Sequence, residues 1–270
     1  IGVYAQCGNS SEALNLFDRM QRNAPPNGIT FANTLKACAN SLDVDRGRGI
    51  YSLMVKYGIA MDTIFGSCLL DMYSKCGNIV DACHVFNSLE NKDAVTYNVM
   101  ISGYAQQGQF LLANECFMNM QRHGLEPDDK TYTSILAGCS HAGLLEQGHD
   151  YFNVMIKKLG MVHGVEIYSC LIDLLGRSGS LNEAIDLLHT IPILPDIVVW
   201  KSLFTSCRTY NNKDLGKWVF DQILYLGLND GFGFVVMSNM YTDDNYAEVW
   251  EIMEQTTVRE DRGSVVCCVH

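Results

Sequence analysis

Cysteine and histidine are the residue types in this chain that most readily suggest chemistry, as metal ligands, disulfides or nucleophiles. The sequence has 11 cysteines and 7 histidines in 270 residues. Structural zinc sites need such residues in close pairs, for example two cysteines separated by two residues. No such pair occurs, and Cys267 and Cys268 adjoin in a tail. The sequence therefore predicts no metal site and no cofactor, and it predicts that Cys38, Cys139 and Cys207 are buried free thiols in helices.

The sequence motifs of common catalytic sites are also missing. There is no phosphate-binding loop of the G-x-x-x-x-G-K-[ST] type, no G-x-S-x-G and no H-E-x-x-H. The apolar runs are short, which argues against a membrane span. We therefore expect a globular chain that is not an enzyme.

The strongest pattern in the sequence is an internal repeat of about 35 residues. The segment from Val95 and the opening of the chain share Tyr-Ala-Gln-x-Gly, followed by Ala, Phe and Met at fixed offsets. Self-similarity at this period is typical of helical repeat proteins. It divides the chain into a partial unit 1–27, the units 28–62, 63–93, 94–128, 129–164, 165–196, 197–230 and 231–264, and a tail 265–270.

Three positions recur within the units and define the elements we expect. Aromatic residues lie at or beside position 4: Phe31, Phe65, Tyr97, Tyr132, Tyr168, Trp200 and Phe234. Position 15 is mostly glycine or asparagine, which tolerate the left-handed conformation that ends a helix, and Leu42 departs from this rule. Position 20 is alanine or glycine, except for Trp250. Each unit should therefore be a helix, a glycine-marked turn and a second helix.

The unit from Ala94 shows these elements in detail. Apolar residues three and four apart predict a first helix over about Tyr97 to Gln106 and a second over about Leu111 to His123. One hairpin cannot bury its apolar face alone, whereas stacked hairpins can. The predicted fold class is therefore all-α, a solenoid of helix-turn-helix repeats.

These units resemble the pentatricopeptide repeat. The residues that carry the resemblance in the unit from Ala94 are Tyr97, Asn98, Gly108, Ala113, Phe117, Met120, Pro127 and Asp128. The alternating unit lengths resemble those of the plant PLS subclass, with an S motif from Ser67 and an L motif from Thr30. The resemblance implies a right-handed superhelical solenoid.

The end of the chain resembles the C-terminal motifs of that subclass. The segment from Tyr168 is similar to the terminal S motif, the segment from Val198 to the first E motif, and the segment from Phe234 to a diverged second E motif. The resemblance thus implies a repeat array over 1–196 and E-type motifs over 197–264.

Members of this family are implicated in organellar RNA processing, and those with E motifs in C-to-U editing. The resemblance therefore implies sequence-specific binding of single-stranded RNA in a mitochondrion or chloroplast. The chain opens at Ile1 inside an amphipathic pattern, so we expect a fragment whose targeting segment lies upstream. A deaminase domain would follow His270 or belong to a partner that docks on the E-type motifs.

Deamination itself is not expected of this chain. Zinc deaminases need a Glu beside a His ligand and a Pro-Cys-x-x-Cys pair. His163 and Glu166 have the wrong spacing and no cysteine pair follows them. We interpret the segment His163 to Glu166 as a turn between repeats.

The resemblance also assigns positions that read bases. Family members read one base per repeat through position 5 and the last residue of the unit, with position 2 as an apolar platform. Ser67 with Asp93 implies a preference for G, and Asn98 with Asp128 implies a preference for U. Because the family runs parallel to RNA, these two pairs predict a 5′-GU-3′ step.

Further RNA-binding residues follow from the same positions. They are Ile64 and Val95 as platforms, together with Ser169, Asp196, Thr133 and Asn27. Lys201, at position 5 of the unit from Ile197, is not expected to read a base. A local alternative exists, because Asp93 and Asp128 are also suited to cap the next helix.

Two other functions compete with RNA recognition. A protein-binding scaffold is favoured by the net charge of −11, since phosphate contacts normally need a basic surface. A catalytically dead or degraded family member is suggested by the diverged last unit.

Overall fold

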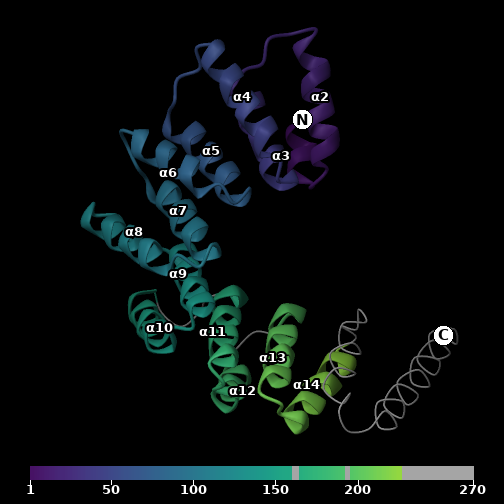
Figure 1. Ribbon diagram of the computed structural model, residues 1–270, viewed down its shortest axis with the longest axis vertical. Helices are drawn as coiled ribbons and strands as arrows, with labels where there is room; N and C mark the ends of the chain where they lie inside the picture. Colours follow the sequence, from purple (N-terminus) through teal and green to yellow (C-terminus); the bar gives the residue numbers. More distant parts are fainter. Residues whose placement is uncertain (160–163, 192–194, 227–270) are drawn as a thin grey trace, which may run out of the picture. The chain divides into compact units, whose positions relative to one another are not determined.

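The computed structural model is all-helical over the residues that it describes, which are 1–159, 164–191 and 195–226. Its helices form consecutive hairpins (Figure 1). The pairs are α1 (Gly2–Gln6) with α2 (Ser10–Gln21), α3 (Gly28–Ser41) with α4 (Val44–Lys56), α5 (Thr63–Lys75) with α6 (Ile79–Ser88), α7 (Ala94–Gln106) with α8 (Phe110–Arg122), α9 (Asp129–Ala142) with α10 (Leu145–Leu159), α11 (Val165–Arg177) with α12 (Leu181–Thr190), and α13 (Ile197–Thr209) with α14 (Lys213–Tyr225). The predicted all-α class of helix-turn-helix repeats is confirmed. The predicted unit 231–264 and the tail 265–270 lie outside the described residues.

The chain divides into two compact units, Ile1–Val162 and His163–His270. In the first unit, the first helices of neighbouring hairpins stack directly, with α1 on α3, α3 on α5, α5 on α7 and α7 on α9. In the second unit, α11 stacks on α13 in the same way. The first helices therefore form the packed column of each unit.

The second helices of the first unit are joined differently. Across the helices described there, the backbones of neighbouring second helices do not meet. Polar side chains bridge them instead: Arg46 of α4 contacts Asp18 of α2 at 2.5 Å, and Arg48 of α4 contacts Asp81 of α6 at 2.8 Å. Exposed ion pairs of this kind each contribute about 0–1 kcal/mol, so the second helices are held mainly by their packing on first helices.

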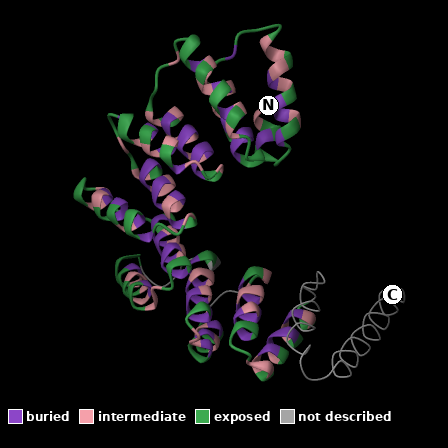
Figure 2. Cartoon of the chain, in the orientation of Figure 1, coloured by how far each residue is buried: buried purple, intermediate pink, exposed green. Residues whose placement is uncertain are grey.

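Buried residues lie where helices face one another (Figure 2). The aromatic residues at position 4 are buried, namely Phe31, Tyr97, Tyr132, Tyr168 and Trp200. Phe65 departs from this rule and is half-buried, because Gly66 occupies position 4 of its unit. A Cβ atom on Gly66 would come within 2.6 Å of the Leu89 side chain, so a larger residue at this position would displace that side chain. Position 20 is buried as expected, with Ala13, Ala82, Ala113 and Ala184 fully excluded from solvent.

The predicted helix ends at position 15 are confirmed. Gly77, Gly108 and Gly143 have φ of 75°, 69° and 68°, in the left-handed region that favours glycine. Leu42 adopts the same conformation with φ of 56°, although a Cβ atom makes it costly. The backbone of the repeat thus overrides the side-chain preference at this one position.

The first helix of the unit from Ala94 begins earlier than the apolar spacing predicted. Helix α7 starts at Ala94 rather than Tyr97, because Asp93 caps it. The Asp93 carboxylate accepts the Thr96 amide at 2.9 Å, and Thr96 Oγ1 accepts the Asp93 amide at 2.9 Å. This capping box satisfies amide groups that would otherwise lack partners. Helix α8 is shifted by one residue, to Phe110–Arg122.

The three cysteines expected to be buried thiols have no exposed surface. Burial is the main cause that raises the pKa of Cys38 and of Cys139 to about 12, so both stay protonated at neutral pH.

Within the described ranges, no group of three or more His, Cys, Asp or Glu side chains could hold a metal ion. No helix among the described residues is long and apolar enough to cross a membrane.

Candidate nucleic-acid interface

A series of aliphatic side chains stands exposed at the second residue of several first helices. Ile64 on α5 is 68% exposed and Val95 on α7 is 56% exposed, and Ile29 on α3 and Val198 on α13 are similar. Lys130 and Glu166 occupy the equivalent positions of α9 and α11. Isolated exposed aliphatic residues are ordinary; here they recur at the same position of four first helices.

The side chains at position 5 lie three residues further along the same helices. Ser67 Oγ donates to the Thr63 carbonyl at 2.8 Å, and Thr133 Oγ1 donates to the Asp129 carbonyl at 2.7 Å. Ser169 is half-buried on α11. Because the Ser67 hydrogen is used within the helix, its oxygen presents lone pairs that can accept a hydrogen bond.

The residues at the ends of the units all cap the next first helix. The side chains of Asn27, Asp93, Asp128 and Asp196 each accept a backbone amide of α3, α7, α9 and α13, respectively. The capping alternative is therefore confirmed for these residues. Capping uses one carboxylate oxygen, and no hydrogen bond from the described residues reaches Oδ2 of Asp93 or Asp128.

One predicted pair is brought together directly. Asn98 Nδ2 donates to Asp128 Oδ1 at 3.0 Å, across from α7 to the start of α9. Thr131 Oγ1 lies 2.5 Å from Asn98 Oδ1 and 2.8 Å from Asp128 Oδ1, so its single hydrogen lies between two acceptors. The three side chains form a cluster that fixes the rotamers of both proposed reading residues.

The cluster also determines the charge of Asp128. Burial disfavours its carboxylate, but the hydrogen bonds from the Thr131 amide and hydroxyl and from Asn98 outweigh this effect. Together with nearby Lys130 they hold the pKa of Asp128 below its ordinary value. Asp128 is therefore an anion, and an acceptor only, at any physiological pH.

The other predicted pairs are not joined by a hydrogen bond. Ser67 bonds to Thr63 and Asp93 to Thr96, each within its own helix. The Asp196 carboxylate bonds to the Val198 and Val199 amides rather than to Ser169.

Thr131 is a member of the cluster that the sequence interpretation missed. The sequence did carry a signal for Thr131. An Asp followed three residues later by a Thr occurs at both Asp93 and Asp128, and this spacing is that of a capping box.

The turn expected over His163 to Glu166 needs a correction. Gly164 is the N-cap of α11, and Glu166 lies in the first turn of that helix; His163 lies outside the described residues.

Family models match much of the chain. The model of the PPR repeat family matches residues 92–141, and the model of the PPR repeat matches residues 1–23, 67–93, 130–158 and 166–191.

Two relatives from Arabidopsis thaliana illustrate the similarity. A pentatricopeptide repeat-containing protein is 38% identical over 242 residues, covering 88% of this chain and 38% of the relative. A mitochondrial pentatricopeptide repeat-containing protein is 37% identical over 265 residues, covering 97% of this chain and 41% of the relative. The chain thus spans about two fifths of the length of these relatives.

A solved structure shares the fold. The pentatricopeptide repeat protein PPR10 in complex with an 18-nt psaJ RNA element has a TM-score of 0.75 and 18% identity, over 93% of this chain and 38% of that chain. PPR10 from maize has a TM-score of 0.53 and 20% identity, over 94% of this chain. At this identity the likeness is one of fold.

Proposed function

Because the chain belongs to the pentatricopeptide repeat family, we propose that it binds single-stranded RNA in organellar RNA processing, with each hairpin facing one nucleotide. The solved relative PPR10 was crystallised with an RNA element, and several relatives are named mitochondrial. The RNA-bound structure supports an RNA ligand, and the names of these relatives support a mitochondrial location; the chloroplast alternative rests on the family resemblance alone.

The observation that carries the proposal is the contact between Asn98 and Asp128 beside the exposed Val95. Uracil presents a ring N–H next to carbonyl oxygens. The second hydrogen of Asn98 Nδ2 can donate to such an oxygen while Asp128 Oδ2 accepts the ring N–H. Val95 then covers one face of the base.

The unit from Thr63 offers a different pattern and is proposed to select guanine. Guanine carries an exocyclic amino group that uracil lacks. The Ser67 hydroxyl hydrogen is used by the Thr63 carbonyl, so its oxygen can accept from that amino group. Asp93, through the oxygen that does not cap α7, can accept the guanine ring N–H, and Ile64 forms the platform. Ser169, Asp196, Thr133 and Asn27 are proposed to contact RNA at the equivalent places in their units.

The finer role we propose is a specificity factor for C-to-U editing. It rests on the similarity of residues 197–264 to E motifs, and it assigns the deamination to a domain or partner other than the described helices.

A protein-binding scaffold is the second candidate, favoured by the net charge of −11. The two differ in whether binding depends on RNA sequence.

The substitution Asn98→Ser tests the proposed reading of uracil. Serine keeps a short polar group but loses the amide donor, so the preference at this nucleotide should move from U towards G by about three- to tenfold. The measurement is the affinity for short single-stranded RNAs with GU or GG at the predicted step, at stated salt. Asn87→Ser, an exposed asparagine on the second helix α6, is the matched control and should leave both affinities unchanged. An unchanged preference in Asn98→Ser removes the role of Asn98, and equal weak binding of all RNAs by the wild type favours the scaffold.

A further inference from the structure

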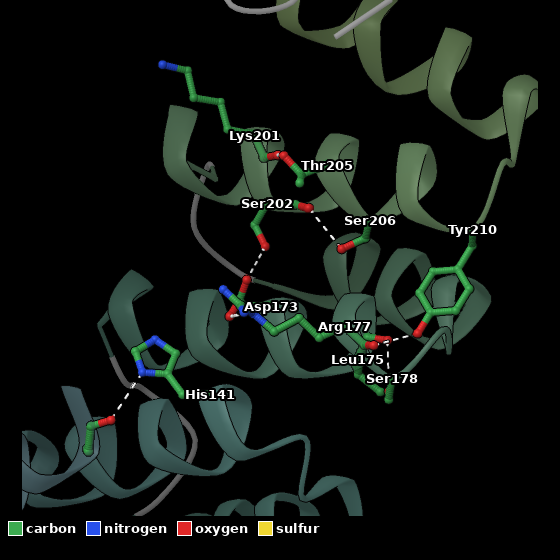
Figure 3. A network of polar contacts seen from close by, with 11 residues as sticks. His141, Asp173, Leu175, Arg177, Ser178, Lys201, Ser202, Thr205, Ser206 and Tyr210 are labelled. Atoms are coloured by element: carbon green, nitrogen blue, oxygen red, sulfur yellow. Dashed lines mark hydrogen bonds and ion pairs between the residues drawn. The ribbon is translucent and has the colours of Figure 1, made fainter. Parts of the chain in front are cut away.

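Neighbouring hairpins are joined by side chains that close the space between them. Figure 3 shows this for the first helices α11 and α13, where Ser202 Oγ donates to Asp173 Oδ1 at 2.6 Å. The Tyr210 hydroxyl donates to the Arg177 carbonyl at 2.5 Å across the same pair of helices. Between neighbouring second helices the described backbones do not meet, so those gaps are closed by side chains alone.

The gap between the second helices α8 and α10 is closed by a tyrosine. Tyr151, at position 23 of its unit, packs edge-to-face on Phe117 with the ring centroids 5.2 Å apart. Its hydroxyl donates to Asn114 Oδ1. The ring and its polar tip are therefore both used to join α10 to α8.

The gap between α12 and α14 in the second unit is closed by a tryptophan. Trp218, at position 22 of its unit, has its ring centroid 6.1 Å from that of His189 on α12 and 6.0 Å from that of Trp200 on α13. In both cases an aromatic ring from the following hairpin fills the space beside the preceding second helix.

The gap between α6 and α8 lacks such a ring. Positions 22 and 23 of the unit from Ala94 are Glu115 and Cys116, where the other two hairpins have Trp218 and Tyr151. Among the described residues, no hydrogen bond, ion pair or ring contact joins α6 to α8. A cavity of about 350 Å³ remains there, a volume within the range of ligand sites.

The lining of this cavity suits an aromatic ligand. It includes three aromatic and three sulfur-bearing side chains, which are Phe86, Tyr97, Tyr104, Cys83, Met100 and Cys116. Aromatic rings pack well against ring edges and against sulfur. Two of the rings are already fixed, because Phe86 packs edge-to-face on Tyr97 at 5.2 Å and the Tyr97 hydroxyl lies 2.6 Å from His123 Nδ1.

The rim of the cavity adds hydrogen-bond acceptors and a negative charge. Glu115 and Asn87 are exposed there, and the oxygens of both can accept a hydrogen bond. Lys92 is already engaged, since its Nζ donates to the Leu89 carbonyl at 2.7 Å and lies 5.2 Å from the centre of the Phe86 ring. The carboxylate of Glu115 therefore favours a ligand that combines an N–H or O–H donor with a positive charge.

A disulfide across the gap is excluded by distance. No Cα atom of α6 lies within 8 Å of one of α8, whereas the Cα atoms of a disulfide lie at most about 6.8 Å apart. Cys83 Sγ instead lies 2.8 Å from the Tyr104 hydroxyl. Burial is the first cause that raises the pKa of Cys116 to about 12, so this thiol stays protonated at neutral pH. The two cysteines therefore serve as lining.

We propose that the cavity between α6 and α8 binds a tryptophan or tyrosine side chain of a partner protein, from a segment in which this residue has a basic neighbour. The ring takes the place that Tyr151 and Trp218 take in their own gaps, and the basic neighbour pairs with Glu115. A protein segment is favoured because the chain completes the equivalent gaps with protein side chains, and because the net charge of −11 attracts a basic partner. The inference does not rest on the proposed RNA binding, since no proposed reading residue lines the cavity.

Short peptides test this proposal on the whole chain. The probe is acetyl-Lys-Trp-Lys-amide, compared by calorimetry with acetyl-Lys-Ala-Lys-amide and with N-acetyltryptophanamide. Burial of the ring should make the Trp peptide bind at least about tenfold more tightly than the Ala peptide. The basic neighbours should give it an advantage of about two- to fivefold over N-acetyltryptophanamide.

Thiol protection locates the bound peptide. The Trp peptide should slow the alkylation of Cys83 by iodoacetamide, followed by mass spectrometry, because it covers the cavity that this thiol lines. Cys7 is exposed and far along the chain from the cavity, so its rate is the internal control and should not change.

Two variants close the cavity from within the chain. Cys116→Tyr places a tyrosine at position 23, as in α10, and Glu115→Trp places an indole at position 22, as in α14. Each should weaken binding of the Trp peptide by at least about tenfold with unchanged helical circular dichroism. Glu115 is exposed, so its variant keeps the test valid if the change at buried Cys116 is not tolerated. Leu111→Trp adds an indole at an exposed residue of α8 outside the lining and should bind as the wild type does.

Glu115→Gln tests the basic neighbour. It should weaken the Trp peptide by about two- to fivefold at low salt, and high salt should remove the difference. Binding of N-acetyltryptophanamide, which carries no charge, should not change. Glu146→Gln makes the same charge change at an exposed residue in the first turn of α10 and is the matched control.

The possible results decide between this inference and its rivals. If the Trp and Ala peptides bind equally, or if the folded cavity-closing variants bind as the wild type does, no aromatic side chain enters the cavity and the inference is overturned. If N-acetyltryptophanamide binds as tightly as the Trp peptide, the cavity serves a free aromatic compound and the partner segment is rejected. RNA affinity is measured separately, so loss of RNA binding leaves this inference intact.

Discussion

At the scale of single residues, Asp128 shows how one carboxylate can have two roles. One oxygen caps α9 and holds Asn98, as any structural N-cap would, and the other oxygen accepts no hydrogen bond from the described residues. A cap fixes the rotamer of its side chain at no cost to the helix. The same bonds that stabilise the fold therefore also hold in place the acceptor that the proposed reading of uracil requires.

The lowered pKa of Asp128 makes a prediction about stability and pH. A carboxyl group whose pKa is lower in the folded state stabilises the fold above its ordinary pKa of about 3.9, and this stabilisation is lost as the pH falls through the lower folded value. Asp128→Asn keeps a good cap but removes the charge. The free energy of unfolding of the variant should therefore be below that of the wild type at pH 6, and the difference should shrink towards pH 3. Urea denaturation at both pH values measures it; a difference that stays constant would contradict the assigned charge interactions.

At the scale of the elements, Leu42 is the residue where local preference and repeat geometry disagree. All other positions with this role in the described units carry glycine or asparagine. The Leu42 side chain is 64% exposed, so it gains little from burial in return for the left-handed conformation. The geometry is imposed by α3 and α4, which must fold back on each other.

Leu42→Gly should therefore stabilise the chain. Relief of the left-handed strain is worth about 1–2 kcal/mol, and the greater freedom of glycine in the unfolded state offsets part of it. The expected net rise in melting temperature is about 1–3 °C, measured by circular dichroism. Gly143→Leu makes the reverse change at the same position of the unit from Asp129, where a Cβ atom would meet nothing within 4 Å. It should lower the melting temperature, and a rise there would refute the backbone explanation.

The elements were largely predictable from fixed offsets, because the buried aromatic, the left-handed turn and the small residue recur in most hairpins. The starts of the first helices were not, since residues such as Val95 are exposed and carry no buried apolar signal. Within the site, the pairing of Asn98 with Asp128 was predicted by resemblance, but the bond to Thr131 needed the geometry.

At the scale of the whole molecule, the acidic composition limits how RNA can be held. The net charge is −11, and two cations of the first helices are paired with carboxylates one turn earlier, Lys75 with Asp71 and Arg177 with Asp173. For the proposed RNA ligand, few phosphates can then be neutralised, and most of the affinity must come from base contacts.

This charge balance predicts a weak dependence of RNA affinity on salt. Two or three phosphate contacts correspond to a slope of about −1.4 to −2.1 in log affinity against log salt, since each contributes about 0.7 for a single strand. The affinity should fall by about seven- to twentyfold between 50 and 200 mM salt. Filter binding or fluorescence anisotropy over that range measures the slope, and a slope steeper than about −4 would show a basic, charge-driven interaction instead.

The direct stacking of the first helices, with side-chain bridges between the second helices, has a mechanical consequence for the first unit. If the first unit bends, the distances between neighbouring second helices, which Arg46 and Arg48 bridge, should change more than the distances between stacked first helices. Long side chains can adjust their conformation, whereas directly packed backbones cannot. Ser67, Asn98 and Thr133 all belong to the stack. A bend in the outer layer would therefore leave the mutual spacing of these three proposed contact residues largely unchanged.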